Sequence, residues 1–462
     1  MTLLSRKLGL ILLAAIVPAA AQSVDTIYTA RYVVTMDAFH RLIENGAVAV
    51  RGERIVDVGP AAEIARKYTS KQRLDRPGDI LMPGLINTHT HAAMSLFRGL
   101  ADDVRLQEWL EKYIFPAEAK NVDPDFVTWG TRLACLEMML SGTTTFVDMY
   151  YFEEKVAEAT KEAGMRGVLG ETIISFKDPD SATPEEGLRY AEKFIQRFKG
   201  DPLIVPAVAP HAVFTNSDES LKASRALANR YGVPFVIHVS ETKKENEDVQ
   251  AKHHMSPTQV LNSLGALDGP TIAAHGVWLD DADIAILKAH NTGIAHNPSS
   301  NMKLASGIAP VVKLLLTGIA VGLGTDGPAG SNNDFDLMED MNLAADLQKV
   351  ATMDPQVLPA EQAVAMATIL GAKVACLEHE IGSLEAGKRA DFITIRLDRP
   401  HAVPMYNVYS QIVYALKGSD VRDVVVNGRN IVRDGRSLTL NAAQIQAKAV
   451  EYGIRVSRSL GH

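Results

Sequence analysis

The chain has 462 residues, of which 47% are hydrophobic and 22% charged, and these proportions are those of a globular protein. Its length exceeds what one small core needs, so we expect a large domain together with a smaller one. The formal net charge is −8 and no basic run stands out. These features disfavour nucleic acid as a partner, and the charge alone says little about the expected small-molecule substrate.

The first 21 residues have the plan of a secretory signal peptide. Arg6 and Lys7 precede an apolar run over residues 8–17, and small residues then lead to a cleavage site near Ala21-Gln22. The apolar run is too short for a permanent membrane anchor. We therefore expect residues 1–21 to be removed and the mature protein to be exported, periplasmic or secreted, with no membrane span.

Short strands and turns occur at both ends of the chain. The N-terminal strands are expected over residues 27–35, 47–51, 54–58 and 80–82, and the C-terminal strands over residues 391–396, 421–426 and 430–433. Asn427-Gly428 is a hairpin signal before the last of these strands. We predict a small β-sandwich domain built from residues 22–82 and 381–436, followed by a C-terminal helix over residues 437–462.

Residues 83–380 alternate strands with helices. Strand-like apolar runs are expected over residues 85–89, 145–149, 167–170, 204–209, 235–239, 271–275, 293–296 and 320–324. Helix-like stretches lie between them, for example over residues 124–140 and 153–163. Eight strands that alternate with helices predict an α/β fold with a (β/α)8 TIM-type barrel, whose catalytic groups come from the carboxyl ends of the strands.

Histidines and one aspartate stand at these strand ends. His89 and His91 lie two positions apart, so on a strand both side chains point to the same face and can bind one metal. His238 lies in the fifth predicted strand, and Asp326 follows the eighth. Imidazole and carboxylate are ligands that zinc and similar divalent ions prefer, and a catalytic site keeps one position open for water. These four residues are the predicted metal ligands.

Proton transfer requires further groups near the metal. Glu241 follows His238 by three residues, where a carboxyl group can move protons between an activated water and a substrate atom. His275 is either a ligand or a hydrogen-bond donor to the attacking hydroxide. Asp326 lies in a tight turn that leaves its carboxylate free to bind metal and to accept a proton. Glu245, close after Glu241, is interpreted as a surface residue.

Several motifs together resemble the amidohydrolase superfamily. The matching stretches include Pro83-Gly84-Leu85-Ile86-Asn87-Thr88-His89-Thr90-His91, His238-Val239-Ser240-Glu241-Thr242, His275-Gly276-Val277, His296-Asn297-Pro298 and Gly324-Thr325-Asp326-Gly327. Within the superfamily, the chain is similar to the methylthioadenosine/S-adenosylhomocysteine deaminases and to their chlorotriazine-hydrolase relatives. The resemblance extends over about residues 26–435.

The resemblance implies one divalent metal ion, with zinc expected first and iron, nickel or manganese as alternatives. It also implies that His275 polarises the attacking water and that the protein forms a homo-oligomer. The implied substrate contacts come from Trp109, Glu118, His211 and Glu241. Among them, Glu118 is similar to a ribose-binding glutamate, a role that suits a carboxylate because it accepts two hydroxyl hydrogen bonds.

The implied reaction is hydrolytic deamination of an adenosine-like nucleoside of the methylthioadenosine, S-adenosylhomocysteine or adenosine type. Asp326 takes a proton from water, and Glu241 protonates the ring nitrogen next to the carbon under attack. One alternative is hydrolysis without deamination, as in triazine dechlorination or the opening of a cyclic amide. Others are deamination of a free base such as 8-oxoguanine or cytosine, and a binding protein without activity, which the complete ligand set disfavours.

One position departs from the pattern of the nucleoside-deaminating relatives. Some of them carry an arginine at the end of the third strand, where this chain has Glu171. This departure disfavours substrates that bear a homocysteine group, and it leaves the prediction of deamination unchanged.

Overall fold

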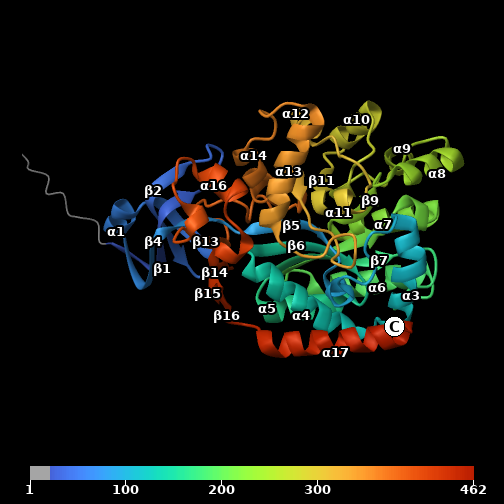
Figure 1. Cartoon of the computed structure of the whole chain (residues 1–462), viewed down its shortest axis with the longest axis horizontal. Helices are drawn as coiled ribbons and strands as arrows, with labels where there is room; N and C mark the ends of the chain where they lie inside the picture. Colours follow the sequence, from blue (N-terminus) through green and yellow to red (C-terminus); the bar gives the residue numbers. More distant parts are fainter. Residues whose placement is uncertain (1–20, 462) are drawn as a thin grey trace, which may run out of the picture.

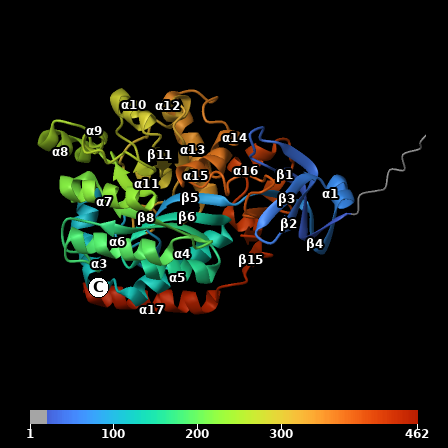
Figure 2. The same ribbon diagram turned by 180° about the vertical axis from the view of Figure 1, so that it is seen from behind.

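The computed structural model describes residues 21–461, so the predicted signal peptide lies outside the described residues except for Ala21. Two sheets of eight strands organise this part of the chain. One sheet lies inside a ring of helices, and the other forms a separate domain at one end of the molecule (Figures 1 and 2). Among the helices of residues 21–461, none combines the length and the apolar character that crossing a membrane requires.

The inner sheet runs through eight parallel strands in chain order. They are β5 (Leu85–Thr90), β6 (Thr143–Tyr150), β7 (Arg166–Ile173), β8 (Ile204–Pro210), β9 (Phe235–Val239), β10 (Thr271–His275), β11 (Gly293–His296) and β12 (Val321–Leu323). Thr88 Oγ1 donates to the Leu323 carbonyl oxygen at 2.9 Å, so the first and last strands meet and the barrel closes. The (β/α)8 barrel and its eight predicted strands are confirmed.

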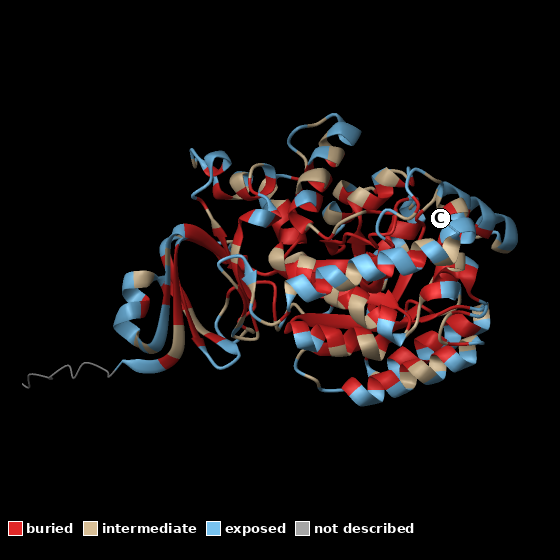
Figure 3. Cartoon of the chain, turned by 60° about the horizontal axis from the view of Figure 1, so that its bottom comes forward, coloured by how far each residue is buried: buried red, intermediate tan, exposed pale blue. Residues whose placement is uncertain are grey.

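Helices cover the barrel, with buried inner faces and exposed outer faces (Figure 3). The longer ones are α4 (Pro124–Leu140), α5 (Glu153–Ala163), α6 (Pro184–Phe198), α7 (Asp218–Tyr231), α8 (Lys243–His253), α10 (Asp281–Ala289) and α13 (Leu337–Thr352). Shorter ones are α2 (Leu106–Glu108), α3 (Phe115–Asn121), α9 (Pro257–Ser263), α11 (Pro298–Lys303), α12 (Val311–Leu316), α14 (Ala360–Met366), α15 (Ile369–Val374) and α16 (Val408–Tyr414). Asp123, Thr183 and Ser217 accept backbone N–H groups at the starts of α4, α6 and α7, which fixes where these helices begin.

The second sheet joins strands from both chain ends. Its strands are β1 (Gln22–Val34), β2 (Leu42–Arg51), β3 (Arg54–Pro60), β4 (Tyr68–Pro83), β13 (Phe392–Arg396), β14 (Val421–Val426), β15 (Arg429–Arg433) and β16 (Arg436–Ser437), and helix α1 (Ala61–Lys67) follows β3. β13 pairs antiparallel with β4 and thereby links the two halves. The Tyr28 and Phe392 rings meet edge-on with centroids 4.8 Å apart, so side chains of both halves share one core. The predicted β-domain from both chain ends is confirmed.

The C-terminal helix α17 (Ala442–Leu460) returns to the barrel and runs along its outer helices (Figure 1). Tyr452 packs edge-on against Phe126 of α4 with ring centroids 5.6 Å apart, and its hydroxyl donates to Asp125. A buried ion pair joins the barrel to the β-domain. There the buried Arg166 guanidinium donates from Nε and Nη2 to Asp391 Oδ2, at 3.0 and 2.9 Å.

Candidate active site

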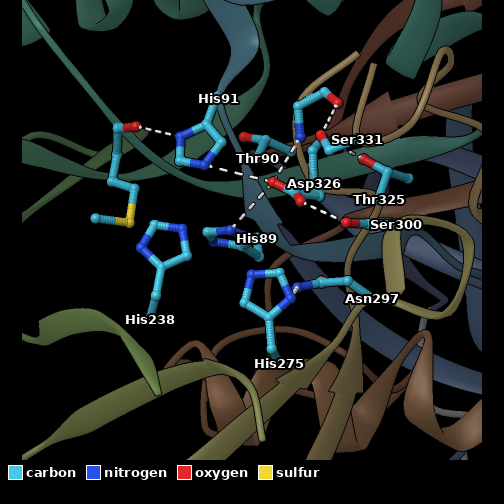
Figure 4. A network of polar contacts seen from close by, with 12 residues as sticks. His89, Thr90, His91, His238, His275, Asn297, Ser300, Thr325, Asp326 and Ser331 are labelled. Carbon is cyan, nitrogen blue, oxygen red and sulfur yellow. Dashed lines mark hydrogen bonds and ion pairs between the residues drawn. The ribbon is translucent and has the colours of Figure 1, made fainter. Parts of the chain in front are cut away.

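Four histidines and one aspartate converge at the mouth of the barrel (Figure 4). His89 lies in β5 and His91 follows it, while His238 lies in β9 and His275 ends β10. The His89 ring centroid lies 4.9 Å from that of His91, 4.8 Å from that of His238 and 5.4 Å from that of His275. Asp326 Oδ1 lies 3.4 Å from Nε2 of both His89 and His91. The structure thus brings together the four predicted ligands and His275.

The side chains of this cluster fit a divalent ion. In residues 21–461, two sets have ligand atoms within 4.8 Å of one another, one of His89, His91 and Asp326 and the other of His89, His238 and His275. Both ring nitrogens of His89 are buried without a hydrogen-bond partner, which is rare for a polar group. Burial lowers the pKa of His89 to about 4, so the imidazole is neutral and able to bind metal.

Backbone carbonyls orient two of the imidazoles. Nδ1 of His91 lies 2.7 Å from the Met149 carbonyl oxygen, and Nδ1 of His238 lies 2.7 Å from the His211 carbonyl oxygen. A carbonyl oxygen accepts a hydrogen bond only, so each Nδ1 carries the proton. In the neutral form of each imidazole, Nε2 is then the nitrogen that can bind an ion.

The Asp326 carboxylate is held from both sides. Its Oδ2 accepts a hydrogen bond from Ser300 Oγ at 2.7 Å, and its Oδ1 accepts one from the Gly327 N–H at 2.7 Å. Although burial acts in the opposite direction, the close contact with His89 and the electrostatic interaction with His275 and His91 hold the pKa of Asp326 well below its usual value. The glycine at position 324 lets the turn before Asp326 approach the backbone of β5, since a Cβ there would lie 2.9 Å from the backbone nitrogen of His89.

Glu241 lies beside His275 at the edge of the histidine cluster. His275 Nε2 is 3.7 Å from Glu241 Oε2, and Ser306 Oγ donates to Glu241 Oε1 at 3.4 Å. Burial raises the pKa of Glu241, which favours the protonated form of its carboxyl group. On its far side, His275 Nδ1 lies 3.0 Å from Asn301 Oδ1 and 3.2 Å from Asn297 Nδ2.

One pocket contains both the cluster and the predicted substrate contacts. Its walls include Trp109, Glu118, His211 and Glu241. Trp109 Nε1 donates to the Ala329 carbonyl oxygen at 2.8 Å, which ties the π-helical turn η2 (Trp109–Ile114) across the pocket. Glu118 accepts a hydrogen bond from the Tyr150 hydroxyl at 2.7 Å, and burial raises the pKa of Glu118 to about 8. Glu118 is therefore a buried polar side chain in the same pocket as the histidine cluster.

The remaining walls are mostly apolar. They are made by Met94, Leu106, Leu110, Ile114, Phe115, Met149, Tyr150, Tyr151, Thr172, Phe214 and Ser331. No lysine or arginine of the described chain lines this pocket. Glu171 is turned away from it, since its Oε2 accepts the Glu153 N–H at 3.1 Å behind the strand. The next residue, Thr172, faces the pocket instead, as alternation along a strand requires.

One glutamate at this site differs from the expectation that its sequence context suggests. Glu245 was interpreted as a surface residue, and that interpretation is wrong: its side chain is buried, and its Oε2 accepts the Glu241 N–H at 2.7 Å. A local signal was available, because Thr242-Lys243-Lys244-Glu245 has the spacing of a capping box at a helix start. The residues that support the cluster, Asn297, Ser300, Asn301 and Ser306, were not identified from the sequence as supports.

The chain is similar to known proteins both in its sequence and in its fold. Residues 80–431 match the amidohydrolase family, and residues 46–69 match a bacterial imidazolonepropionase-like composite domain. A 5-methylthioadenosine/S-adenosylhomocysteine deaminase 1 of Syntrophus aciditrophicus is 47% identical, over 95% of this chain and 99% of its own. A crystal structure of an adenosine deaminase from Xanthomonas campestris with bound zinc has a TM-score of 0.93 at 34% identity, covering 95% and 100% of the two chains. An atrazine chlorohydrolase from Arthrobacter aurescens, complexed with zinc, has a TM-score of 0.85 at 25% identity, covering 92% and 99%.

Proposed function

Since the chain belongs to the amidohydrolase family, we propose that it is a metal-dependent aminohydrolase that releases ammonia from an adenosine-like nucleoside. The observation that carries the proposal is a single pocket lined by side chains of the histidine cluster, by Glu241 and by the buried Glu118. The carboxyl group of Glu241 can donate a proton to a nitrogen of the substrate ring. Glu118 suits the hydroxyls of a ribose, which a free base or a triazine lacks.

We propose zinc as the ion, held by His89, His91, His238 and Asp326. Support comes from the imidazole and carboxylate donors and from the zinc in both solved relatives. When bound, such an ion lowers the pKa of a coordinated water toward neutrality. Elemental analysis of the purified protein should find one zinc per chain. Iron, nickel or manganese in its place, or two ions per chain, would overturn this assignment.

The side chains of the site divide the proton transfers among them. Asp326 is ionised and accepts a proton from the attacking water. Glu241 donates its proton to the ring nitrogen next to the carbon under attack, and His275 forms a hydrogen bond with the attacking oxygen. Once the new carbon–oxygen bond has formed, the carbon–nitrogen bond to the amino group breaks, while the added hydroxyl gives its proton to the Glu241 carboxylate and becomes the carbonyl. Asp326 returns its proton to the departing nitrogen, which leaves as ammonia.

The proposal is tested by measuring ammonia release from adenosine, 5′-deoxyadenosine, methylthioadenosine, guanine, 8-oxoguanine, cytosine and atrazine. We expect release from the nucleosides and little from the free bases. Release from the free bases alone would remove the ribose role of Glu118 and favour a base deaminase. Chloride release from atrazine without ammonia release from any nucleoside would favour the triazine-type alternative.

The pocket walls predict that a charged group on the 5′ carbon is disfavoured. The amino-acid end of S-adenosylhomocysteine carries an ammonium and a carboxylate, and no lysine or arginine of residues 21–461 lines the pocket to pair with the latter. We expect kcat/KM for methylthioadenosine to exceed that for S-adenosylhomocysteine by about 100-fold, or about 3 kcal/mol. Competition between the two nucleosides in one reaction measures this ratio directly. Equal values would contradict the prediction while leaving deamination intact.

We propose further that the protein is exported. Support comes from Arg6 and Lys7, the apolar run over residues 8–17 and the small residues that lead to Ala21. N-terminal sequencing of protein recovered from the natural host should begin near Gln22. A mature chain that begins at Met1 would contradict export.

We also propose that the protein assembles as a homo-oligomer. Large apolar side chains are exposed on neighbouring segments, with exposed fractions of 84% for Phe39, 86% for Met353 and 92% for Tyr406. α16 packs against α13, and Tyr409 of α16 donates to the His40 carbonyl oxygen, so these segments lie close together. Exposed apolar groups gathered in one region are typical of association surfaces. Light scattering should give a mass at least twice that of the chain, and a monomer mass would contradict the proposal.

A further inference from the structure

A second buried glutamate lies behind Glu241. The exposed fraction of Glu245 is 6%, close to the 7% of Glu241. Glu245 is the third residue of α8, and its backbone N–H donates to the side chain of Thr242, which caps this helix. A carboxylate is costly to bury, so its contacts should explain why it is there.

Glu245 uses both carboxylate oxygens on the loop that carries Glu241. Oε2 accepts the Glu241 N–H at 2.7 Å, and Oε1 accepts the Ser240 N–H at 3.2 Å. Ser240 has a φ of 52°, a left-handed conformation that costs energy for a residue with a side chain. Its carbonyl oxygen accepts the N–H groups of Val277 and Trp278, at 3.1 and 2.9 Å. The loop is therefore held from both sides in a conformation it would not favour alone.

The side chain of Glu241 has little other support. Among residues 21–461, the one hydrogen bond that reaches its carboxyl group comes from Ser306 Oγ, at the long distance of 3.4 Å. His275 Nε2 lies farther away, at 3.7 Å from Glu241 Oε2. The direction of the Glu241 side chain therefore depends mainly on its backbone, and Glu245 accepts the N–H groups of this backbone at Ser240 and Glu241.

We propose that Glu245 is a positioning residue, whose carboxylate fixes the Ser240–Glu241 backbone so that the Glu241 carboxyl group reaches the substrate ring. The inference rests on the proposed role of Glu241 as proton donor in deamination. A glutamate that only caps a helix would reach back to the N–H of the cap residue, which here is Thr242. Glu245 reaches past Thr242 to the two residues before it, and these lead into the active site.

The test compares Glu245→Gln with Glu247→Gln. Glutamine has the shape of glutamate but offers one acceptor oxygen, so either the Ser240 or the Glu241 N–H would face an amide nitrogen. We expect kcat to fall about 10- to 100-fold in Glu245→Gln, as for other residues that support a catalytic group, with zinc content unchanged. Glu247→Gln is the matched control, because Glu247 lies on the same helix with 61% of its side chain exposed. It should retain the kcat of the wild type.

A double variant separates positioning from general loss of structure. In a Glu241→Gln background, adding Glu245→Gln should lower kcat less than about twofold, since residues that act as a unit are non-additive. A structural role would cost the same factor in both backgrounds, and that result would overturn the inference. The apparent Kd for the deaminated product should change little in Glu245→Gln, because product binding needs no proton donor.

The outcomes also separate this inference from the proposed function. A wild-type kcat in Glu245→Gln, with Glu241→Gln inactive, would overturn the positioning role and leave the deaminase intact. A wild-type kcat in Glu241→Gln would overturn the proposed function itself. If Glu245→Gln melts at a lower temperature or loses zinc, Glu245→Asp decides the matter. Its shorter carboxylate keeps the charge but should still lower kcat if distance to the Ser240 and Glu241 N–H groups is what counts.

Discussion

Glu241→Gln should lower kcat for nucleoside deamination by about 10³-fold, within the range that a positioned general acid contributes. Glutamine keeps the shape and the hydrogen bond from Ser306 but holds no proton that it can transfer to the ring nitrogen. KM should change little, since the same contacts remain in the ground state. Steady-state assays of ammonia release at saturating methylthioadenosine measure the effect.

The pH dependence of kcat/KM gives an independent check on Glu241. Burial raises the pKa of Glu241, so its acid form persists to a higher pH than in an exposed glutamate. The rate should fall as pH rises through that pKa, because the proton to be donated is then lost. The residual activity of Glu241→Gln should lack this alkaline decline. Full activity in the variant would instead favour hydrolysis without ring protonation, as in the triazine-type alternative.

His89→Ala should remove both zinc and activity. His89 belongs to both sets of side chains that can share an ion, and neither of its buried ring nitrogens has a hydrogen-bond partner among the described residues. We expect at least about a 10⁴-fold loss of kcat/KM, because no ion then lowers the pKa of the attacking water toward neutrality. Elemental analysis and ammonia release should fall together.

The control for this prediction is His379→Ala, since the His379 side chain is 94% exposed and lies outside the cluster. It should keep zinc and activity. Treatment of the wild type with a chelator should also lower its melting temperature, because an ion that binds the native state alone stabilises it. Activity that survives complete removal of metal would contradict the metal-dependent mechanism.

The sequence alone was sufficient to predict the barrel and the residues at its centre. The alternation of strands and helices is a local property of the chain, and the eight strands of the barrel lie where it indicates. Once the barrel is accepted, the rule that strand ends form the site brings His89, His238 and Asp326 together. Nothing beyond residue type and position was needed for this step.

Which polar side chains are buried was decided by the tertiary structure. Glu245 lies in a helix whose sequence is almost wholly polar, and periodicity gives no reason to bury it. The loop that it supports is also hydrogen-bonded to Val277 and Trp278, which follow β10, and no local pattern in the helix encodes these contacts. The same holds for Glu118, whose partner Tyr150 lies 32 residues away on β6.

The shape of the pocket also could not be predicted from the sequence. Part of its apolar wall comes from the segment around η2, and this segment is held by a hydrogen bond between Trp109 and Ala329, 220 residues apart. Alternation along β7 could be read from the sequence, but only the packing shows that Thr172 faces the pocket and Glu171 does not. Local patterns determine the elements and what their ends carry, whereas burial and pocket charge depend on which distant segments cover them.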